Sequence, residues 1–185
     1  SGIPKLGYDR GWNFMIGAAA LIGGSQSKVL TYQTAADASG GLTTYTFAAQ
    51  AIGTASNNRR VIVAVHSENI TAQTVSTLTV GGISATQAAG VTSGDSGTEI
   101  WIALVPTGTT ADIVVTFSGS TNLAGVGVWS CTGLNSNTPF ATGTSTADPG
   151  TATIATLAGG FCVSAGSTHA STSVTWTNVT EKYDQ

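Results

Sequence analysis

The chain has 185 residues and a formal net charge of −3, and only 8% of its residues are charged whereas 41% are hydrophobic. This length suits one domain with a core of its own, so stability requires neither a metal nor a disulfide framework. The basic residues are scattered except for the adjacent Arg59 and Arg60, which argues against nucleic acid as a partner.

The first distinctive segment in chain order is apolar and covers residues 14–22. It is shorter than the roughly 20 residues that cross a bilayer as a helix, so the sequence predicts no membrane span. We interpret it as a short buried helix or as an assembly anchor. Residues 1–27 are therefore predicted to be an N-terminal extension that attaches the protein to a larger assembly, with these candidate assembly residues: Trp12, Phe14, Met15 and Ile16.

From residue 28 onward, alternating β-branched and aromatic residues predict strands along nearly the whole chain. The alternation is strongest in residues 61–65, 100–104 and 113–117. Weaker strands are predicted at residues 29–34, 43–48, 75–80, 124–131, 151–157, 161–167 and 173–179.

Groups rich in Gly, Ser, Asn and Asp separate these segments and predict chain reversals. They lie at residues 39–41, 56–58, 81–82, 93–97, 106–108, 118–120, 148–150 and 159–160. Regular spacing of strands and turns, without a long helical period, predicts an all-β fold. We expect one antiparallel β-sandwich of the jelly-roll or Greek-key type over residues 28–185.

The loop at residues 93–97 contains Gly-Asp-Ser-Gly, which matches the short sequence around the nucleophile of trypsin-like proteases. The same residues suit a tight hairpin loop. A serine nucleophile also needs an oriented base and oxyanion donors, and neither His66 nor His169 has suitable spacing from Ser96. We therefore interpret Ser96 as a turn residue.

Other chemistry has few candidates in this sequence. Glu68 and Glu99 are the only carboxylates that we weigh as a hydrolase pair, because such a pair must face each other across a cleft. No residues with metal-ligand or cofactor-binding spacing are present, so we predict no catalytic, metal or cofactor site. Cys131 and Cys162 lie in apolar segments, and both a disulfide and two free buried thiols remain open.

Aromatic residues provide the best argument for binding. Exposed tryptophan faces can stack on sugar rings, whereas tryptophans within strands more often fill cores or oligomer contacts. Both interpretations apply to Trp101, Trp129 and Trp176.

Five segments together resemble a β-sandwich domain of structural proteins from tailed bacteriophages and related prophage elements. They are RRVIVAV at 59–65, LTVGGISAT at 78–86, IWIALVPTGTTADIVVTF at 100–117, GVW at 127–129 and WTNVTEKYD at 176–184. The resemblance covers residues 43–184 and implies head fibres, decorations or tail appendages without catalytic residues. Such domains usually continue beyond the Tyr-Asp segment, so we expect either a truncated domain or a strand supplied by a neighbour.

The sequence therefore predicts a non-enzymatic structural component of a bacteriophage virion. Its expected partners are copies of itself and other virion proteins, and its expected location is the extracellular particle. A carbohydrate-binding or host-receptor-binding module is the alternative, and a hydrolase is the weakest interpretation.

Overall fold

The structure is a computed structural model that describes residues 13–20, 28–147, 151–155, 157–168 and 180–182. This part of the chain forms antiparallel strands and contains no helix. The strands are β1 (Asn13–Ala20), β2 (Val29–Ala51), β3 (Arg60–Glu68), β4 (Val75–Val80), β5 (Ile83–Ser84), β6 (Thr86–Ser93), β7 (Ser96–Leu104), β8 (Thr110–Thr132), β9 (Ala141–Ser145) and β10 (Ser164–Thr168). The predicted all-β, antiparallel fold is confirmed, whereas the β-sandwich architecture of the jelly-roll or Greek-key type stays a prediction.

No helix long and apolar enough to cross a membrane occurs among the described residues.

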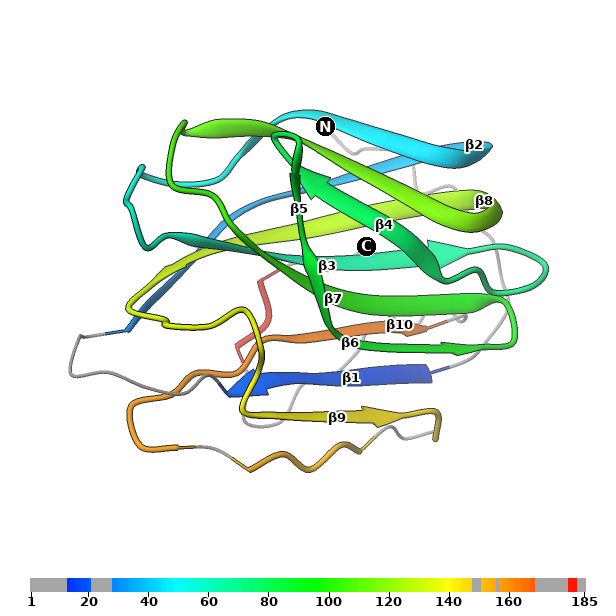
Figure 1. The fold of residues 1–185 in the computed structure, drawn as a ribbon. Coiled ribbons are helices and arrows are strands. Elements are labelled where there is room, and N and C mark those ends of the chain that lie inside the picture. Colours follow the sequence, from blue (N-terminus) through cyan, green and yellow to red (C-terminus); the bar gives the residue numbers. More distant parts are fainter. Residues whose placement is uncertain (1–12, 21–27, 148–150, 156, 169–179, 183–185) are drawn as a thin grey trace, which may run out of the picture.

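The main sheet has seven strands and is organised around β8. Residues 123–131 of β8 pair with β3, whereas residues 113–117 pair with β4, and β2 runs along both halves of β8. The remaining strands extend this order to β5-β4-β8-β3-β7-β6. Because β4 and β5 also contact β7, the bent sheet nearly closes into a barrel-like shape (Figure 1).

The bend of this sheet lies where the sequence predicted two chain reversals, at residues 39–41 and 118–120. That prediction was wrong, because both segments lie inside the long strands β2 and β8. The pairing shifts register there: Ser39 lies opposite Leu123, but Thr44 already lies opposite Thr116. Extra residues on paired strands make bulges that bend a sheet without ending it. Small, turn-forming residues here bend the paired ribbon.

Tyr45 braces this bend from the inside. Its hydroxyl donates to the carbonyl oxygen of Thr121 and accepts from the backbone N–H of Leu42, at 3.2 Å between N and Oη. The ring itself is buried and packs edge-on against Phe117, with centroids 6.1 Å apart. One side chain therefore connects both strands at the point where their regular pairing is interrupted.

Two apolar clusters lie on opposite faces of β3 and β7. The inner core fills the bent main sheet and includes Tyr45, Phe47, Val61, Val63, Val65, Leu78, Trp101, Ile113, Val115, Phe117, Val126 and Val128. The outer core lies on the other face and contains Ile62, Ala64, Ala89, Ile100, Ile102, Cys131, Leu134 and Val163. Strands β3 and β7 are thus buried on both faces, which explains the continuous apolar runs at residues 61–65 and 100–104.

A smaller three-stranded sheet, in the order β10-β1-β9, covers the outer core. Part of the predicted N-terminal extension forms its middle strand, so the helical alternative for residues 14–22 was wrong at residues 14–20. The assembly role of that segment and the domain boundary at residue 27 stay predictions. Figure 1 shows this sheet in blue, orange and yellow beside β6.

The C-terminal predictions had mixed outcomes. The predicted strand at residues 151–157 was wrong, because residues 151–155 and 157 have no regular structure. The strand predicted at 161–167 is present but begins three residues later, as β10. The one predicted at 173–179 lies outside the described residues.

The adjacent basic residues hold loops in place. The buried Arg59 guanidinium donates four hydrogen bonds, at donor–acceptor distances of 2.6–2.8 Å. The acceptors are the backbone carbonyl oxygens of Gly53, Val105, Thr107 and Gly108. Arg60 similarly donates to the side chain of Asn137 and the carbonyl oxygen of Leu134. Both side chains are therefore used inside the fold.

We predict that Tyr45→Phe lowers the free energy of unfolding by about 1–2 kcal/mol, because it removes the hydroxyl from a buried carbonyl acceptor and preserves the ring. Urea denaturation measures this change. Tyr32→Phe, near the start of the same strand, is the control and should change stability less. Equal effects of the two substitutions would contradict the role of the Tyr45 hydroxyl in connecting β2 and β8.

Candidate functional site

Ser96 lies in the hairpin between β6 and β7. Ser93 pairs with Ser96, and Gly94, with φ of 58°, forms the connecting turn with Asp95. The Ser96 side chain is buried, and its hydroxyl lies 3.4 Å from Oδ1 of Asp95. No hydrogen bond between Ser96 and His66 occurs in the described part of the chain. This geometry agrees with the turn interpretation.

The two carboxylates weighed as a hydrolase pair do not face each other. Glu68 lies opposite Ser96, and Glu99 lies opposite Val65. Because side chains alternate along a strand, Glu99 shares the inner-core face with Val65, while Glu68 is on the other face. The sheet separates the two carboxylates, so the pair predicted as an alternative hydrolase site was wrong.

Glu99 instead connects three parts of the main sheet. Its Oε1 accepts from the backbone N–H of Val75 at 2.7 Å, and its Oε2 accepts from Gln87 at 2.8 Å and from the indole of Trp101 at 2.9 Å. Burial raises the pKa of Glu99 above its ordinary value, while these hydrogen bonds act in the opposite direction. The contacts fix the start of β4 against β6 and β7.

The predicted tryptophans have different surroundings. Trp101 is 7% exposed and belongs to the inner core, which matches the core interpretation. Trp129 is half-buried and lines a pocket. Trp176 and Trp12 lie outside the described residues. Of the other candidate assembly residues, Phe14, Met15 and Ile16, each lies in β1 and pairs with β10.

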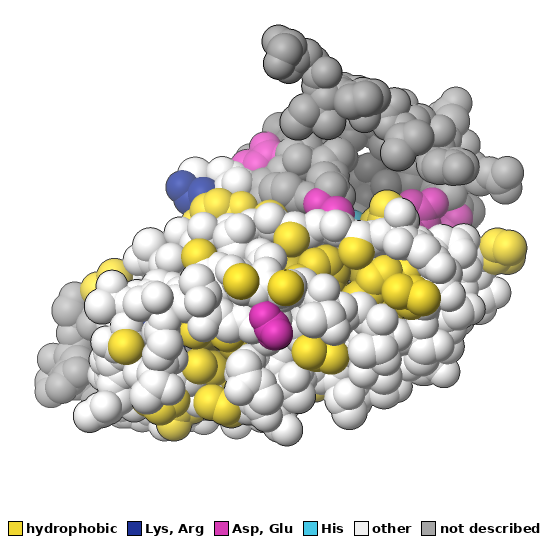
Figure 2. Space-filling view, turned by 90° about the horizontal axis from the view of Figure 1, so that it is seen from above, with side chains coloured by type: hydrophobic (Ala, Val, Ile, Leu, Met, Phe, Trp, Pro, Cys, Tyr) yellow, Lys and Arg dark blue, Asp and Glu magenta, His cyan; other side chains and the backbone are white. Residues whose placement is uncertain are grey.

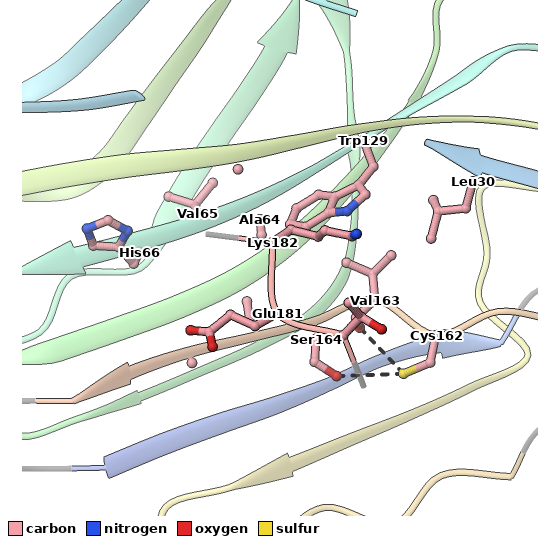
Figure 3. Close-up of a pocket in the computed structure, with 14 residues that line it drawn as sticks. Leu30, Ala64, Val65, His66, Trp129, Cys162, Val163, Ser164, Glu181 and Lys182 are labelled. Carbon is pink, nitrogen blue, oxygen red and sulfur yellow. Dashed lines mark hydrogen bonds between the residues drawn. The ribbon is translucent and has the colours of Figure 1, made fainter. Parts of the chain in front are cut away.

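The pocket has a volume of about 370 Å³ and lies between the main sheet and the small sheet. Its main-sheet wall comes from the start of β2, from β3 and from β8, where Trp129 lies. The opposite wall comes from residues 162–166 and 180–182. Figure 3 shows these lining residues, with Trp129, Lys182 and His66 among those labelled.

Gly127 determines how Trp129 lies. A Cβ at residue 127 would come within 3.1 Å of two atoms of the indole six-membered ring, so the glycine lets the ring lie close against the β8 backbone and a larger residue would push it outward by a few tenths of an ångström. Tyr32 packs edge-on against the same indole, with ring centroids 5.6 Å apart and an interplanar angle of 66°. The indole is therefore positioned from two sides.

A second glycine on the same face accommodates the side chains of Asp37 and His66. Oδ1 of Asp37 and Nε2 of His66 lie 3.6 Å apart, across residue 125 of β8. A Cβ at Gly125 would come within 2.1 Å of both side chains. Burial lowers the pKa of His66, and the carboxylate of Asp37 acts in the opposite direction. His66 therefore presents a mainly neutral imidazole to the pocket at neutral pH.

Cys131 and Cys162 are not bridged to each other by a disulfide. Cys131 is buried in the outer core, and burial raises the pKa of its thiol to about 12. Cys162 is half-buried and lines the pocket. Cys131 is therefore protonated at neutral pH and poorly suited to act as a nucleophile.

Sequence reasoning missed the pocket because its walls come from distant segments. The useful signal was the alternation of Gly125 and Gly127 before Trp129, which leaves one strand face without side chains. Among the residues that the structure describes, no group of three or more His, Cys, Asp or Glu side chains could hold a metal ion.

Known protein families, curated proteins and solved structures give no significant match to this chain. The resemblance of residues 43–184 to a bacteriophage domain therefore stays a prediction.

We predict that Glu99→Gln lowers the free energy of unfolding by about 1–3 kcal/mol, because the new amide nitrogen must face at least one buried donor. The difference in the free energy of unfolding between wild type and Glu99→Gln should shrink as pH rises above the ordinary glutamate pKa. The raised pKa of Glu99 means that the folded state binds a proton more tightly than the unfolded state, so its contribution to stability falls as pH rises through the folded pKa.

Urea denaturation of both proteins from pH 4 to pH 8, values chosen to span the ordinary glutamate range, measures this difference. The same pH dependence in wild type and variant would contradict the assigned environment of Glu99.

Proposed function

We propose that this protein is a non-enzymatic structural subunit that assembles with copies of itself. The open edge of β2 carries this proposal. Among the described strands, β2 pairs only with β8, and it extends over 23 residues. An unpaired edge exposes backbone donors and acceptors, which makes it a template for another strand.

The side chains of β2 offer little obstruction to such pairing. Proteins commonly protect long edges with lysine or proline, and neither occurs between Val29 and Ala51. The one charged residue of the strand, Asp37, lies next to His66. Register shifts interrupt the strand, and the longest regular stretch is residues 34–39. A second copy pairing along this stretch is the occupant that we favour.

The remainder of the surface is consistent with assembly through neutral contacts. Figure 2 views the molecule from above Figure 1, and its described surface is mostly uncharged, with hydrophobic groups between polar ones. Val29 and Leu42 on β2 are 52% and 50% exposed. Such a surface provides little like-charge repulsion between identical copies.

The resemblance of residues 43–184 to virion proteins supplies the setting of the proposal. A bacteriophage particle uses many copies of one subunit, so a strand-rich subunit with few charged residues and an open edge suits head fibres, decorations or tail appendages. Imaging of the particle that copurifies with the native protein tests this setting, and absence of the protein from any regular particle would overturn it.

We predict that the native protein forms a stable multimer and that Thr31→Lys combined with Ser39→Lys shifts it toward the monomer. Both side chains are exposed. Thr31 lies three residues before the regular stretch of β2 and Ser39 is its last residue, so each substitution adds a charge to the pairing edge. Sedimentation or native mass measurement at several protein concentrations determines the shift.

Thr54→Lys combined with Thr71→Lys is the matched control, because it adds the same charge at exposed positions outside β2. A monomeric wild type, or equal dissociation in both double variants, would overturn pairing through this edge.

A further inference from the structure

The pocket beside Trp129 has dimensions that limit its ligand. Its volume of about 370 Å³ lies near the lower end of the roughly 300–1,000 Å³ typical of small-molecule sites. It lies between two sheets, and strands form much of its lining. Such a site suits a compact ligand of monosaccharide or disaccharide size.

Trp129 supplies an apolar plate within this space. The indole is half-buried, and Gly127 and Tyr32 position it on two sides. Ala64 and Val163 extend the apolar lining on the two facing walls. Because the indole is already held in position, it loses little conformational freedom on binding. Its flat surface suits a ligand that has a flat apolar face of its own.

Polar groups border this plate and offer both donors and acceptors. His66 lies on the main sheet, Ser164 lies on β10, and the last described segment adds Thr180, Glu181 and Lys182. Figure 3 shows Lys182 beside Trp129, whereas Glu181 points the other way. A ligand in this pocket therefore meets hydroxyl, imidazole, carboxylate and ammonium groups around an aromatic centre.

The charges of the lining do not favour a strongly charged ligand. Glu181 and Lys182 carry opposite charges, and burial favours the neutral form of His66, so the pocket has no strong preference for anions or cations. A wholly apolar ligand would cover the polar groups without hydrogen-bonding to them, which is unfavourable. The lining favours a neutral ligand that combines an apolar face with polar edges.

We propose that this pocket binds a neutral carbohydrate, with one face of a sugar ring stacked on Trp129 and its hydroxyl groups bonded to the surrounding polar side chains. The C–H face of a pyranose matches the indole, and its ring of hydroxyl groups can both donate and accept. This site is independent of strand pairing at β2, so the protein would be a structural subunit that also recognises glycans.

Titration calorimetry and saturation-transfer NMR on the full chain test the proposal. The probes are glucose, galactose, mannose, N-acetylglucosamine, maltose, cellobiose and lactose, with adenine as a flat, non-saccharide competitor. We predict saturable binding of at least one sugar, and Trp129→Ala should weaken it by about tenfold or more. Phe140→Ala is the matched control, because Phe140 is 38% exposed and outside the pocket lining, and it should not alter the affinity.

Two further variants keep the test decisive if Trp129→Ala does not fold. Glu181→Gln and Lys182→Ala change exposed side chains outside regular structure, and each should weaken sugar binding by roughly two- to tenfold. Circular dichroism establishes that each variant is folded.

Absence of saturable binding by all seven sugars would overturn the proposal, as would tighter binding of adenine than of any sugar. Sugar affinity that is unchanged in every folded pocket variant would overturn it as well. Native mass measured on the same samples reports strand-mediated assembly separately, so failure of one proposal is distinguishable from failure of the other.

Discussion

Burial of β3 and β7 on both faces is the constraint on which the fold depends. Val61, Val63 and Val65 face the inner core, while Ile62 and Ala64 face the outer core. A strand in this position cannot alternate polar and apolar residues, because neither face meets water. The bent main sheet must therefore cover one face, and the small sheet formed by β1, β9 and β10 must cover the other.

The few charged residues in the interior have structural roles that follow from this layering. Arg59 and Arg60 come directly before the buried residues of β3, and their side chains donate hydrogen bonds that hold loops. Glu99 of β7 accepts hydrogen bonds inside the main sheet. A buried ionisable group costs free energy unless its hydrogen-bonding capacity is met. The buried arginines therefore lie where loop carbonyl oxygens need donors, and the buried glutamate lies where the N–H group at the start of a strand needs an acceptor.

Local pattern predicted the elements better than their arrangement. Alternation predicted the strands around residues 61–65 and 100–104, and turn chemistry predicted the hairpin at Gly94, because these features depend on neighbouring residues. The segments at 39–41 and 118–120 could equally reverse or bend the chain, and only the pairing of β2 with β8 decides between these outcomes. Likewise, Trp101 and Trp129 both lie inside predicted strands, but one faces the inner core and the other faces a pocket.

The two proposals meet at Tyr32. This residue belongs to β2, the strand with the open edge, and its ring contacts Trp129 in the pocket. Tyr32 lies two residues before the stretch 34–39 along which we propose pairing with a second copy, so the two proposed sites are neighbours on one strand and share none of these residues. A many-copy assembly would then combine weak individual sites into avid attachment to a glycan surface.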